Sequence, residues 1–243
     1  MHSTEPASLH VVTRREELDP ARVAGKVVVV IDILFATSTI VHALAGQVAA
    51  IWPARDEEHA GALARLRPDA IRAGEYGART LPGFAPAAPL ALAAHLDGAR
   101  ELVYCTTNGT RAFAGAALAD AVYAGALTNA SALARHIARA HPGAGVLLVC
   151  AGSLGRFCLE DFLGAGSLVS RLRAAAEYAP SDAALAAELA AAAAAGVADV
   201  LAQSRTGRLL RDLGLAGEIE AVAQVDSCEV VPVLRDGCLV QAG

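Results

Sequence analysis

The stretch that decides the fold of this chain reads Val27-Val28-Val29-Val30-Ile31-Asp32-Ile33-Leu34-Phe35-Ala36-Thr37-Ser38-Thr39. An unbroken run of β-branched residues predicts a strand that is buried on both faces, as in a parallel sheet. The Thr/Ser cluster that follows is typical of a helix N-terminus. Asp32 therefore lies where a central strand ends and a helix begins, and in open α/β sheets ligands bind at this edge.

Apolar strand-like segments alternate with helical patterns along the first 178 residues. The expected strands cover Val27–Ile33, Ala49–Trp52, Ala70–Ala73, Leu102–Cys105, Ala121–Ala124 and Val146–Cys150. The expected helices cover Thr37–Ala45, Glu57–Arg67, Arg111–Leu118, Ala130–Ala140 and Leu159–Arg173. This alternation predicts an α/β fold in which a mainly parallel sheet is flanked by helices.

The chain changes character after Tyr178. An alanine-rich helix is expected over Ala183–Ala198, and a second helix is expected near Ser204–Leu213. Two strand-like segments, Glu229–Leu234 and Cys238–Gln241, flank an Asp-Gly pair that favours a hairpin turn. We therefore expect an α/β core over residues 1–178 with the active site at its strand edge. Residues 179–243 would form a C-terminal helix-plus-hairpin extension that packs on the core. This extension need not be an independent domain.

The composition excludes several classes of protein and several kinds of binding partner. The 243 residues are 55% hydrophobic and only 19% charged, which favours a large core and excludes a disordered chain. The net charge of −5 gives no basic footprint for nucleic acid, and no apolar stretch approaches the roughly 20 residues that span a bilayer. The five cysteines are widely spaced without a Cys-x-x-Cys pair, which argues against zinc and redox motifs and favours the cytoplasm.

A polar loop follows the expected strand Leu102–Cys105 and reads Thr106-Thr107-Asn108-Gly109-Thr110-Arg111. Asn-Gly favours a tight turn, and a helix N-terminus after such a turn offers free N–H groups to an anion. Arg111 would add a forked contact to a phosphate or sulfonate. The alternative, weighed as equal, is a turn plus helix cap with Arg111 in solvent. The loop residues expected to bind substrate are Thr106, Thr107, Gly109, Thr110 and Arg111.

Carboxylates follow other expected strands. Glu75 stands between two glycines, and Gly152 and Ser153 lead from a strand toward Glu160 and Asp161 at a helix start. Taken alone, Glu75 fits an ordinary turn, and the two helix-start carboxylates fit a favourable interaction with the helix dipole. Together with Asp32 they would line one sheet edge, where clustered carboxylates need a cation. Oxygen-only ligands suit Mg²⁺, and Mg²⁺ beside an anion-binding loop suits attack on a phosphate ester.

Several other catalytic motifs are absent from the sequence. There is no Gly-x-x-x-x-Gly-Lys-Ser/Thr loop and no Gly-x-Ser-x-Gly nucleophile elbow. Asp32 is followed by Ile33 and Leu34 and not by a second aspartate, which argues against a dehalogenase-type aspartyl phosphatase.

These motifs, taken in order, resemble the 2-phosphosulfolactate phosphatase family over most of the chain, from about Val27 to Val240. The resembling pieces are residues 30–39, Ala73-Gly74-Glu75, residues 106–111, Asn129-Ala130-Ser131-Ala132, Cys150-Ala151-Gly152, Leu159-Glu160-Asp161, Ala165-Gly166 and Ser204-Arg205-Thr206-Gly207-Arg208. The resemblance implies an α/β fold particular to that family and a Mg²⁺-dependent phosphatase. The implied reaction converts 2-phospho-3-sulfolactate to 3-sulfolactate, a step toward coenzyme M in some organisms.

The chain departs from the family pattern at positions expected to touch substrate. Phe35 and Tyr76 stand where the pattern has arginines, and Gly83-Phe84 is followed by Ala85-Pro86-Ala87-Ala88-Pro89 in place of a Gly-Asn-Ser-Pro stretch. A lost hydrogen bond to a charged group costs roughly 1.5–3 kcal/mol, so an uncompensated loss would weaken binding of a multiply charged anion. Three other arginines could take the place of the two missing ones: Arg79, Arg156 and Arg205.

Two hypotheses of different class follow. In the first, the protein is a phosphatase of a small anionic phosphate ester, with an altered or less anionic substrate. Asp32, Glu75 and Asp161 would be the metal ligands or acid–base groups, Asn108 would act with them in catalysis, and Glu160 would orient a ligand or water. The nucleophile, water or an aspartate, stays open, and so does the oligomeric state, for which a homodimer is one candidate. In the second hypothesis, the protein has lost catalysis and serves as a small-anion binding or scaffold protein.

Overall fold

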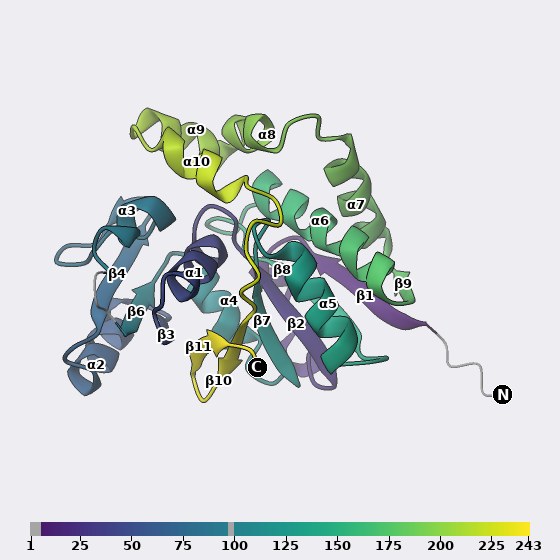
Figure 1. Ribbon diagram of the computed structural model, residues 1–243, viewed down its shortest axis with the longest axis horizontal. Coiled ribbons are helices and arrows are strands. Elements are labelled where there is room, and N and C mark those ends of the chain that lie inside the picture. Colours follow the sequence, from purple (N-terminus) through teal and green to yellow (C-terminus); the bar gives the residue numbers. More distant parts are fainter. Residues whose placement is uncertain (1–5, 97–99) are drawn as a thin grey trace.

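Figure 1 shows the protein as a computed structural model, which describes residues 6–96 and 100–243. Within these residues, eleven strands form one sheet in the order β5-β4-β6-β3-β11-β10-β7-β2-β8-β1-β9. The strands are β1 (Ala7–Val12), β2 (Lys26–Ile31), β3 (Ala50–Ala54), β4 (Ile71–Tyr76), β5 (Arg79–Thr80), β6 (Glu101–Cys105), β7 (Ala121–Gly125), β8 (Gly145–Cys150), β9 (Tyr178–Pro180), β10 (Pro232–Arg235) and β11 (Cys238–Gln241).

The sheet consists of two parallel blocks joined by an antiparallel hairpin. Strands β7, β2, β8, β1 and β9 form one parallel block, and β3, β6 and β4 form the other. The hairpin β10–β11 lies between them and is joined to each block by one residue pair, Val233 with Tyr123 and Leu239 with Ile51. Because so few pairs join the hairpin to the blocks, the ladder constrains the twist of the sheet little at this point.

Helices cover both faces of the sheet. They are α1 (Ala36–Ala45), α2 (Glu57–Leu66), α3 (Pro89–Ala93), α4 (Gly109–Gly115), α5 (Ala130–Ala140), α6 (Leu159–Ala175), α7 (Asp182–Ala193), α8 (Val197–Gln203), α9 (Arg205–Asp212) and α10 (Ala216–Val222). Two short 3₁₀ helices, Arg15–Glu17 and Pro20–Arg22, follow β1.

The valine run of β2 is buried on both faces, as its sequence predicts. Val27 and Val29 pack into the apolar cluster that holds α5, α6 and α7, whereas Val28 and Val30 pack into the cluster that holds α1 and α4. This arrangement follows from the alternation of side chains along a strand. The end of β2, and with it Asp32, is thereby fixed in the middle of the parallel block.

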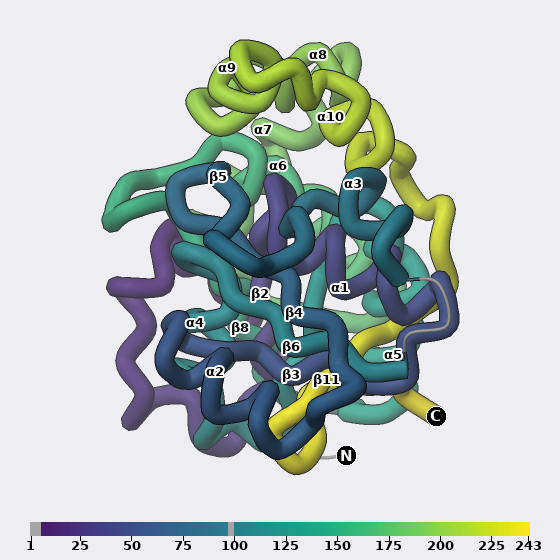
Figure 2. Tube along the Cα trace, turned by 90° about the vertical axis from the view of Figure 1, so that its left-hand side faces the viewer, coloured from purple at the N-terminus to yellow at the C-terminus, as the bar shows by residue number. Residues whose placement is uncertain are grey.

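The last three helices form a small cap, which we define as α8, α9 and α10. They lie together at the top of both Figure 1 and Figure 2. Within the cap, Glu218 of α10 accepts hydrogen bonds from the N–H groups of Leu90 (2.9 Å) and Ala91 (2.8 Å), in the first turn of α3. A buried carboxylate therefore ties the cap to the block formed by β3, β6 and β4.

The predicted α/β fold, with its sheet and flanking helices, is confirmed. Three details differ from the expectations. The alanine-rich helix ends at Ala193, and α8 begins at Val197 after Gly196, so one expected helix is two. The C-terminal hairpin lies inside the sheet and does not pack on it, because the edges of both blocks beside it offer unpaired backbone groups. Strands β1, β5 and β9 and helices α3 and α10 were not expected, since they are short or mixed in polarity. The division at residues 178 and 179 stays a prediction.

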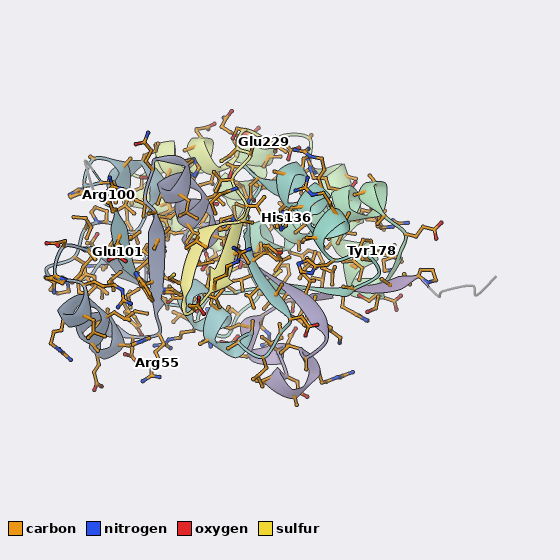
Figure 3. All side chains as sticks on the ribbon, turned by 60° about the horizontal axis from the view of Figure 1, so that its bottom comes forward. Arg55, Arg100, Glu101, His136, Tyr178 and Glu229 are labelled. Carbon is orange, nitrogen blue, oxygen red and sulfur yellow. The ribbon has the colours of Figure 1, made fainter. Side chains whose placement is uncertain are left out.

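The sheet order agrees with the positions of side chains in Figure 3. Glu101 of β6 and Tyr178 of β9 lie on opposite sides of the molecule, and His136 of α5 lies between them.

Of the helices in the described ranges, none is by itself both long and apolar enough to cross a bilayer. Only α7 and α8 taken as a pair, with a bend of 112° between them, reach that length and composition.

Candidate functional site

The carboxyl ends of both parallel blocks line a single cavity of about 360 Å³. Loops after β2 and β8 contribute from one block, β4 and the loops after β4 and β6 contribute from the other, and α9 closes the side. The predicted site residues that line this cavity are Asp32, Glu75, Thr107, Asn108, Gly152, Ser153, Glu160 and Asp161. The structure therefore brings these eight predicted residues together around one cavity, and their chemical roles stay a prediction.

Glu75 joins the ends of β4 and β6. One carboxylate oxygen accepts a hydrogen bond from the N–H of Thr107 (2.7 Å). The other accepts from the Thr107 hydroxyl (3.0 Å) and from the N–H of Ala78 (2.8 Å). Charge-assisted hydrogen bonds of this kind are stronger than neutral ones, so this buried carboxylate holds the loop that carries Asn108.

Asp161 joins the ends of β2 and β8 in the same way. Its two oxygens accept hydrogen bonds from the N–H of Ile33 (2.9 Å) and of Gly152 (3.0 Å). Burial, with the charges of Asp32 and Glu160 added, raises the pKa of Asp161 well above its ordinary value. In both Glu75 and Asp161, each carboxylate oxygen therefore accepts a hydrogen bond from a backbone N–H group of the cavity wall.

Asp32 is a second buried carboxylate whose pKa its surroundings raise. One oxygen accepts a hydrogen bond from the N–H of Phe35 (2.8 Å), while the other faces Gly109. Burial and the charge of Glu75 raise the pKa of Asp32 to about 7, and Glu160 adds to the effect. The Asp32 carboxylate is thus poorly compensated within the protein, which is the electrostatic condition that a bound cation relieves.

Glu160 and Asn108 lie with Asp32 in the lining of the cavity, and we call these three residues the polar floor. Glu160 is only 2% exposed, and no hydrogen bond to its carboxylate is found among the residues that the structure describes; its oxygens are not among the fully enclosed unpartnered atoms, so they face the open cavity. Asn108 accepts a hydrogen bond from the N–H of Leu154 (3.1 Å), so its amide NH₂ remains as the donor it can offer to a ligand. A carboxylate that faces the cavity without a protein hydrogen bond is available to a ligand there.

Four residues of the predicted anion-binding loop do not line this cavity. Thr106 and Thr110 bond to each other, each hydroxyl accepting from the other's N–H at 3.2 Å. Arg111 lies in a separate hollow on the other side of Thr107, where its Nε donates to the carbonyl of Arg55 (2.9 Å). Gly109 serves packing, because a Cβ there would lie 2.5 Å from Asp32 Oδ2. Of the alternative, a turn plus helix cap with Arg111 in solvent, the turn and the exposed Arg111 agree with this geometry, but no side chain caps the start of α4.

The predicted set of three metal-binding carboxylates is not assembled. Within residues 6–96 and 100–243, no three Asp, Glu, His or Cys side chains are placed to hold one metal ion together. The physical reason is that Glu75 and Asp161 turn their oxygens to backbone N–H groups. Mg²⁺ does not require such a set, because it often keeps several waters and binds one or two carboxylates plus a substrate phosphate. Asp32 and Glu160, both buried in the cavity, fit that smaller donor set.

The departures from the family pattern fall in different places. Phe35 lines the cavity, but Tyr76 is 63% exposed and lies in the hollow that contains Arg111. The carbonyl of Ala87 accepts hydrogen bonds from the hydroxyls of Thr39 (2.8 Å) and Tyr104 (2.6 Å), which makes this stretch part of the core. Of these positions as the structure describes them, only Phe35 lines this cavity, and contact with substrate stays a prediction.

Of the three candidate substitutes, Arg156 and Arg205 line the cavity, and Arg79 of β5 does not. Sequence reasoning gave no role to other lining residues, among them Cys158, Thr206 and Leu209. The signal for Thr206 was present, since it lies within the Ser204–Arg208 motif. Cys158 and Leu209 carried no signal, because each resembles an ordinary apolar position.

Comparison with known proteins agrees with the motifs. The family described as 2-phosphosulpholactate phosphatase matches residues 12–237. A protein of Deinococcus radiodurans named "Probable 2-phosphosulfolactate phosphatase" is 35% identical over 231 residues, which are 94% of this chain and 96% of that protein. Proteins with the same name from Symbiobacterium thermophilum (35% identity, 89% of this chain and 94% of that protein) and Thermus thermophilus (37%, 86% and 88%) are similar as well. With a match over nearly its whole length, this chain belongs to the 2-phosphosulfolactate phosphatase family.

Proposed function

We propose that this protein is a Mg²⁺-dependent phosphatase that hydrolyses a small phosphate monoester, 2-phosphosulfolactate or a related phosphorylated hydroxy acid. The observation that carries the proposal is the cavity floor, where Asp32 has a pKa raised to about 7 and the Glu160 carboxylate faces the cavity with no hydrogen bond from any described residue. Such groups favour a bound dication, and the names of the similar proteins supply the substrate class. A role in coenzyme M formation and a cytoplasmic location belong to the same proposal.

Asp32 and Glu160 are the residues that would hold Mg²⁺. When bound, the ion supplies positive charge that neutralises the phosphoryl oxygens of the ester. Asn108 donates from its NH₂ group to a phosphoryl oxygen, since its carbonyl oxygen is engaged by Leu154. Glu75 and Asp161 hold the loops that present these groups, and we assign them a positioning role in place of direct metal ligation.

The test is a phosphate-release assay on the metal-stripped protein, with and without Mg²⁺. The substrates are 2-phosphosulfolactate, phosphoglycolate, 3-phosphoglycerate and p-nitrophenyl phosphate. We expect turnover of at least one ester that depends on Mg²⁺ and falls at least about 100-fold in the Asp32→Asn variant. This variant can keep the oxygen that accepts from Phe35, and it replaces the other oxygen by an uncharged NH₂ group. Asp69→Asn, at a position that does not line the cavity, is the control.

Calorimetric titration with Mg²⁺ separates this proposal from the alternative of a non-catalytic anion-binding protein. We expect Mg²⁺ to bind the unaltered protein and to bind Asp32→Asn and Glu160→Gln more weakly. Normal Mg²⁺ binding without turnover of any ester would favour the anion-binding alternative. Equal affinity in all three proteins would show that the ion, if it binds, does so elsewhere.

A further inference from the structure

Two arginines at the wall of the cavity have no acidic partner. Arg156 and Arg205 both line the cavity, and within residues 6–96 and 100–243 neither takes part in an ion pair. The chain has 25 acidic residues against 20 basic ones, and four buried carboxylates lie around the same cavity. Two guanidinium groups left unpaired in these surroundings remain free to bind an anionic ligand.

A tight turn presents Arg156. Ser153 and Arg156 exchange backbone hydrogen bonds of 2.9 and 3.1 Å, and the two residues between them, Leu154 and Gly155, have positive φ angles of 51° and 73°. Positive φ at both central residues is the conformation of the tightest hairpin turns. Asn108 accepts from the N–H of Leu154, and the Arg14 guanidinium donates to the carbonyl of Gly155 (3.0 Å). The backbone that carries Arg156 is thus held in place before any ligand arrives.

Arg205 comes from a rigid corner between α8 and α9. It is the first residue of α9, whose start is capped by the buried Ser204 hydroxyl accepting from the N–H of Gly207 (2.9 Å). A Cβ on Gly207 would lie 1.9 Å from the carbonyl oxygen of Leu201, so the corner is closely packed. The Arg205 guanidinium donates to the carbonyl of Ser153 (3.3 Å), which begins the turn described above. Both charges are therefore gathered at one turn, although they come from distant parts of the chain.

We propose that Arg156 and Arg205 bind a second anionic group of the substrate, a carboxylate or a sulfonate. The cavity then selects phosphate monoesters that carry such a group over monoesters that carry none. The proposal rests on the proposed function, in which the phosphoryl end occupies the floor formed by Asp32, Glu160 and Asn108. The planar guanidinium group fits carboxylate and sulfonate oxygens through paired hydrogen bonds, and its charge persists at any physiological pH.

The experiment compares two esters on matched variants. The variants are Arg156→Met and Arg205→Met, which keep an unbranched side chain and remove the charge. The control is Arg208→Met, on the same helix α9, because Arg208 does not line the cavity and donates to the carbonyl of Gln203. Steady-state kinetics are measured with 2-phosphosulfolactate, which carries further anionic groups, and with p-nitrophenyl phosphate, which carries none beyond its phosphate.

For 2-phosphosulfolactate we expect kcat/KM to fall roughly 10- to 100-fold in each variant, mainly through a higher KM. For p-nitrophenyl phosphate we expect a change of less than about 3-fold, and Arg208→Met should resemble the unaltered protein with both esters. Arg205→Lys should recover part of the loss, because it keeps the charge without the fork. Equal losses on both esters would overturn the proposal, since the arginines would then serve the phosphoryl group, and so would no loss on either.

A binding measurement keeps the proposal testable if the protein turns over no ester. The probe is 3-sulfolactate, which has the second anionic groups but no phosphate, titrated calorimetrically in the presence of Mg²⁺. Binding to the unaltered protein that weakens at least about 10-fold in Arg156→Met and Arg205→Met supports the proposal even when the phosphatase activity fails. Absence of binding to the unaltered protein, or equal binding to all variants, overturns it.

Discussion

Four carboxylates around one cavity divide into two kinds by their hydrogen bonds. Glu75 and Asp161 each accept hydrogen bonds on both oxygens from backbone groups, and this ties neighbouring loops together. Asp32 accepts from the backbone of its own turn, at Phe35 and Ala36, and for Glu160 no hydrogen bond is found among the described residues. The first pair shapes the site, whereas the second pair is available to a ligand.

Replacing Glu75 by glutamine is expected to lower the pKa of Asp32, because the charge of Glu75 contributes to raising it. An amide also cannot accept all three hydrogen bonds of the carboxylate, so the loop after β6 should loosen and activity should fall at least about 10-fold. Carbon-detected NMR titration of the Asp32 carboxyl in the metal-free protein measures the first effect. Glu57→Gln, in the first turn of α2, is the control. An Asp32 pKa unchanged within about 0.3 units would contradict the assigned interaction.

Gly109 has no room for a side chain. A Cβ there would lie 2.4 Å from the Ala36 Cβ and 2.5 Å from Asp32 Oδ2, so Gly109→Ala must displace Asp32 or the start of α4. We expect a loss of about 1–3 kcal/mol in stability together with most of the activity. The matched control is Gly61→Ala in α2, where the nearest atom is the end of a flexible arginine at 3.7 Å. That change should stabilise the protein by roughly 0.5–1 kcal/mol, and thermal unfolding compares the two.

At the scale of elements, the cap of α8, α9 and α10 carries part of the cavity wall. Helix α9 supplies Arg205, Thr206 and Leu209, and α10 is anchored to α3 by Glu218. This carboxylate caps α3 from outside the helix, since it accepts two of the N–H groups that no helical partner satisfies. The position of the wall therefore depends on a hydrogen bond pair between elements that are far apart in sequence.

Glu218→Gln should weaken this anchor, because an amide offers one oxygen where the carboxylate offers two. We expect a stability loss of about 1–3 kcal/mol, and faster hydrogen exchange in peptides covering α3 and α10 than in those covering β2 and β8. The KM for an anionic ester should rise with little change in kcat, since the role proposed for α9 is to bind substrate and not to react with it. Glu220→Gln, on the exposed side of α10, serves for comparison. Exchange that is unchanged in α3 would refute the role of Glu218.

At the scale of the whole molecule, the cavity exists because two parallel blocks meet. Asn108 from one block accepts from Leu154 of the other, and Gly109 packs against Asp32 across the same boundary. Bringing the blocks together also brings their acidic groups together, and their mutual repulsion opposes folding when no cation is present. We therefore expect the stability of the molecule to depend on pH and, through the proposed metal site, on Mg²⁺.

The metal-free protein should become less stable as pH rises from about 4 through about 7. In the folded state Asp32 holds its proton up to about pH 7, whereas in the unfolded chain it releases it near its ordinary value of 3.8. The folded protein thus binds more protons across this window, so each rise in pH favours unfolding. A loss of about 1 kcal/mol lowers the Tm by about 2–4 °C in a chain of this size, so a fall of at least about 3 °C is expected.

Calorimetric unfolding near pH 5 and near pH 8, with a chelator and with saturating Mg²⁺, measures this effect. Mg²⁺ should raise the Tm more at the higher pH, because it binds the ionised carboxylates, and Asp32→Asn should flatten the dependence on pH. A metal-free Tm that rises between these two pH values would show that other groups dominate the linkage.

The sequence by itself determined which segments become strands and helices in the parallel blocks, and which polar residues follow them. The valine run of β2 and the Thr-Asn-Gly turn are local patterns, and the physical preferences behind them act over a few neighbouring residues. The same locality explains why Asp32, Asn108 and Glu160 could be placed at strand ends and helix starts without coordinates.

Only the tertiary structure decided how those residues are used. The hairpin β10–β11 entered the sheet between two blocks, Arg111 turned to the carbonyl of Arg55, and Arg205 came to the cavity from the cap. Each outcome depends on a partner far away in the chain. Pairing between distant strands and the direction of a long side chain are set by which hydrogen-bonding groups folding brings near, and no local pattern encodes that proximity.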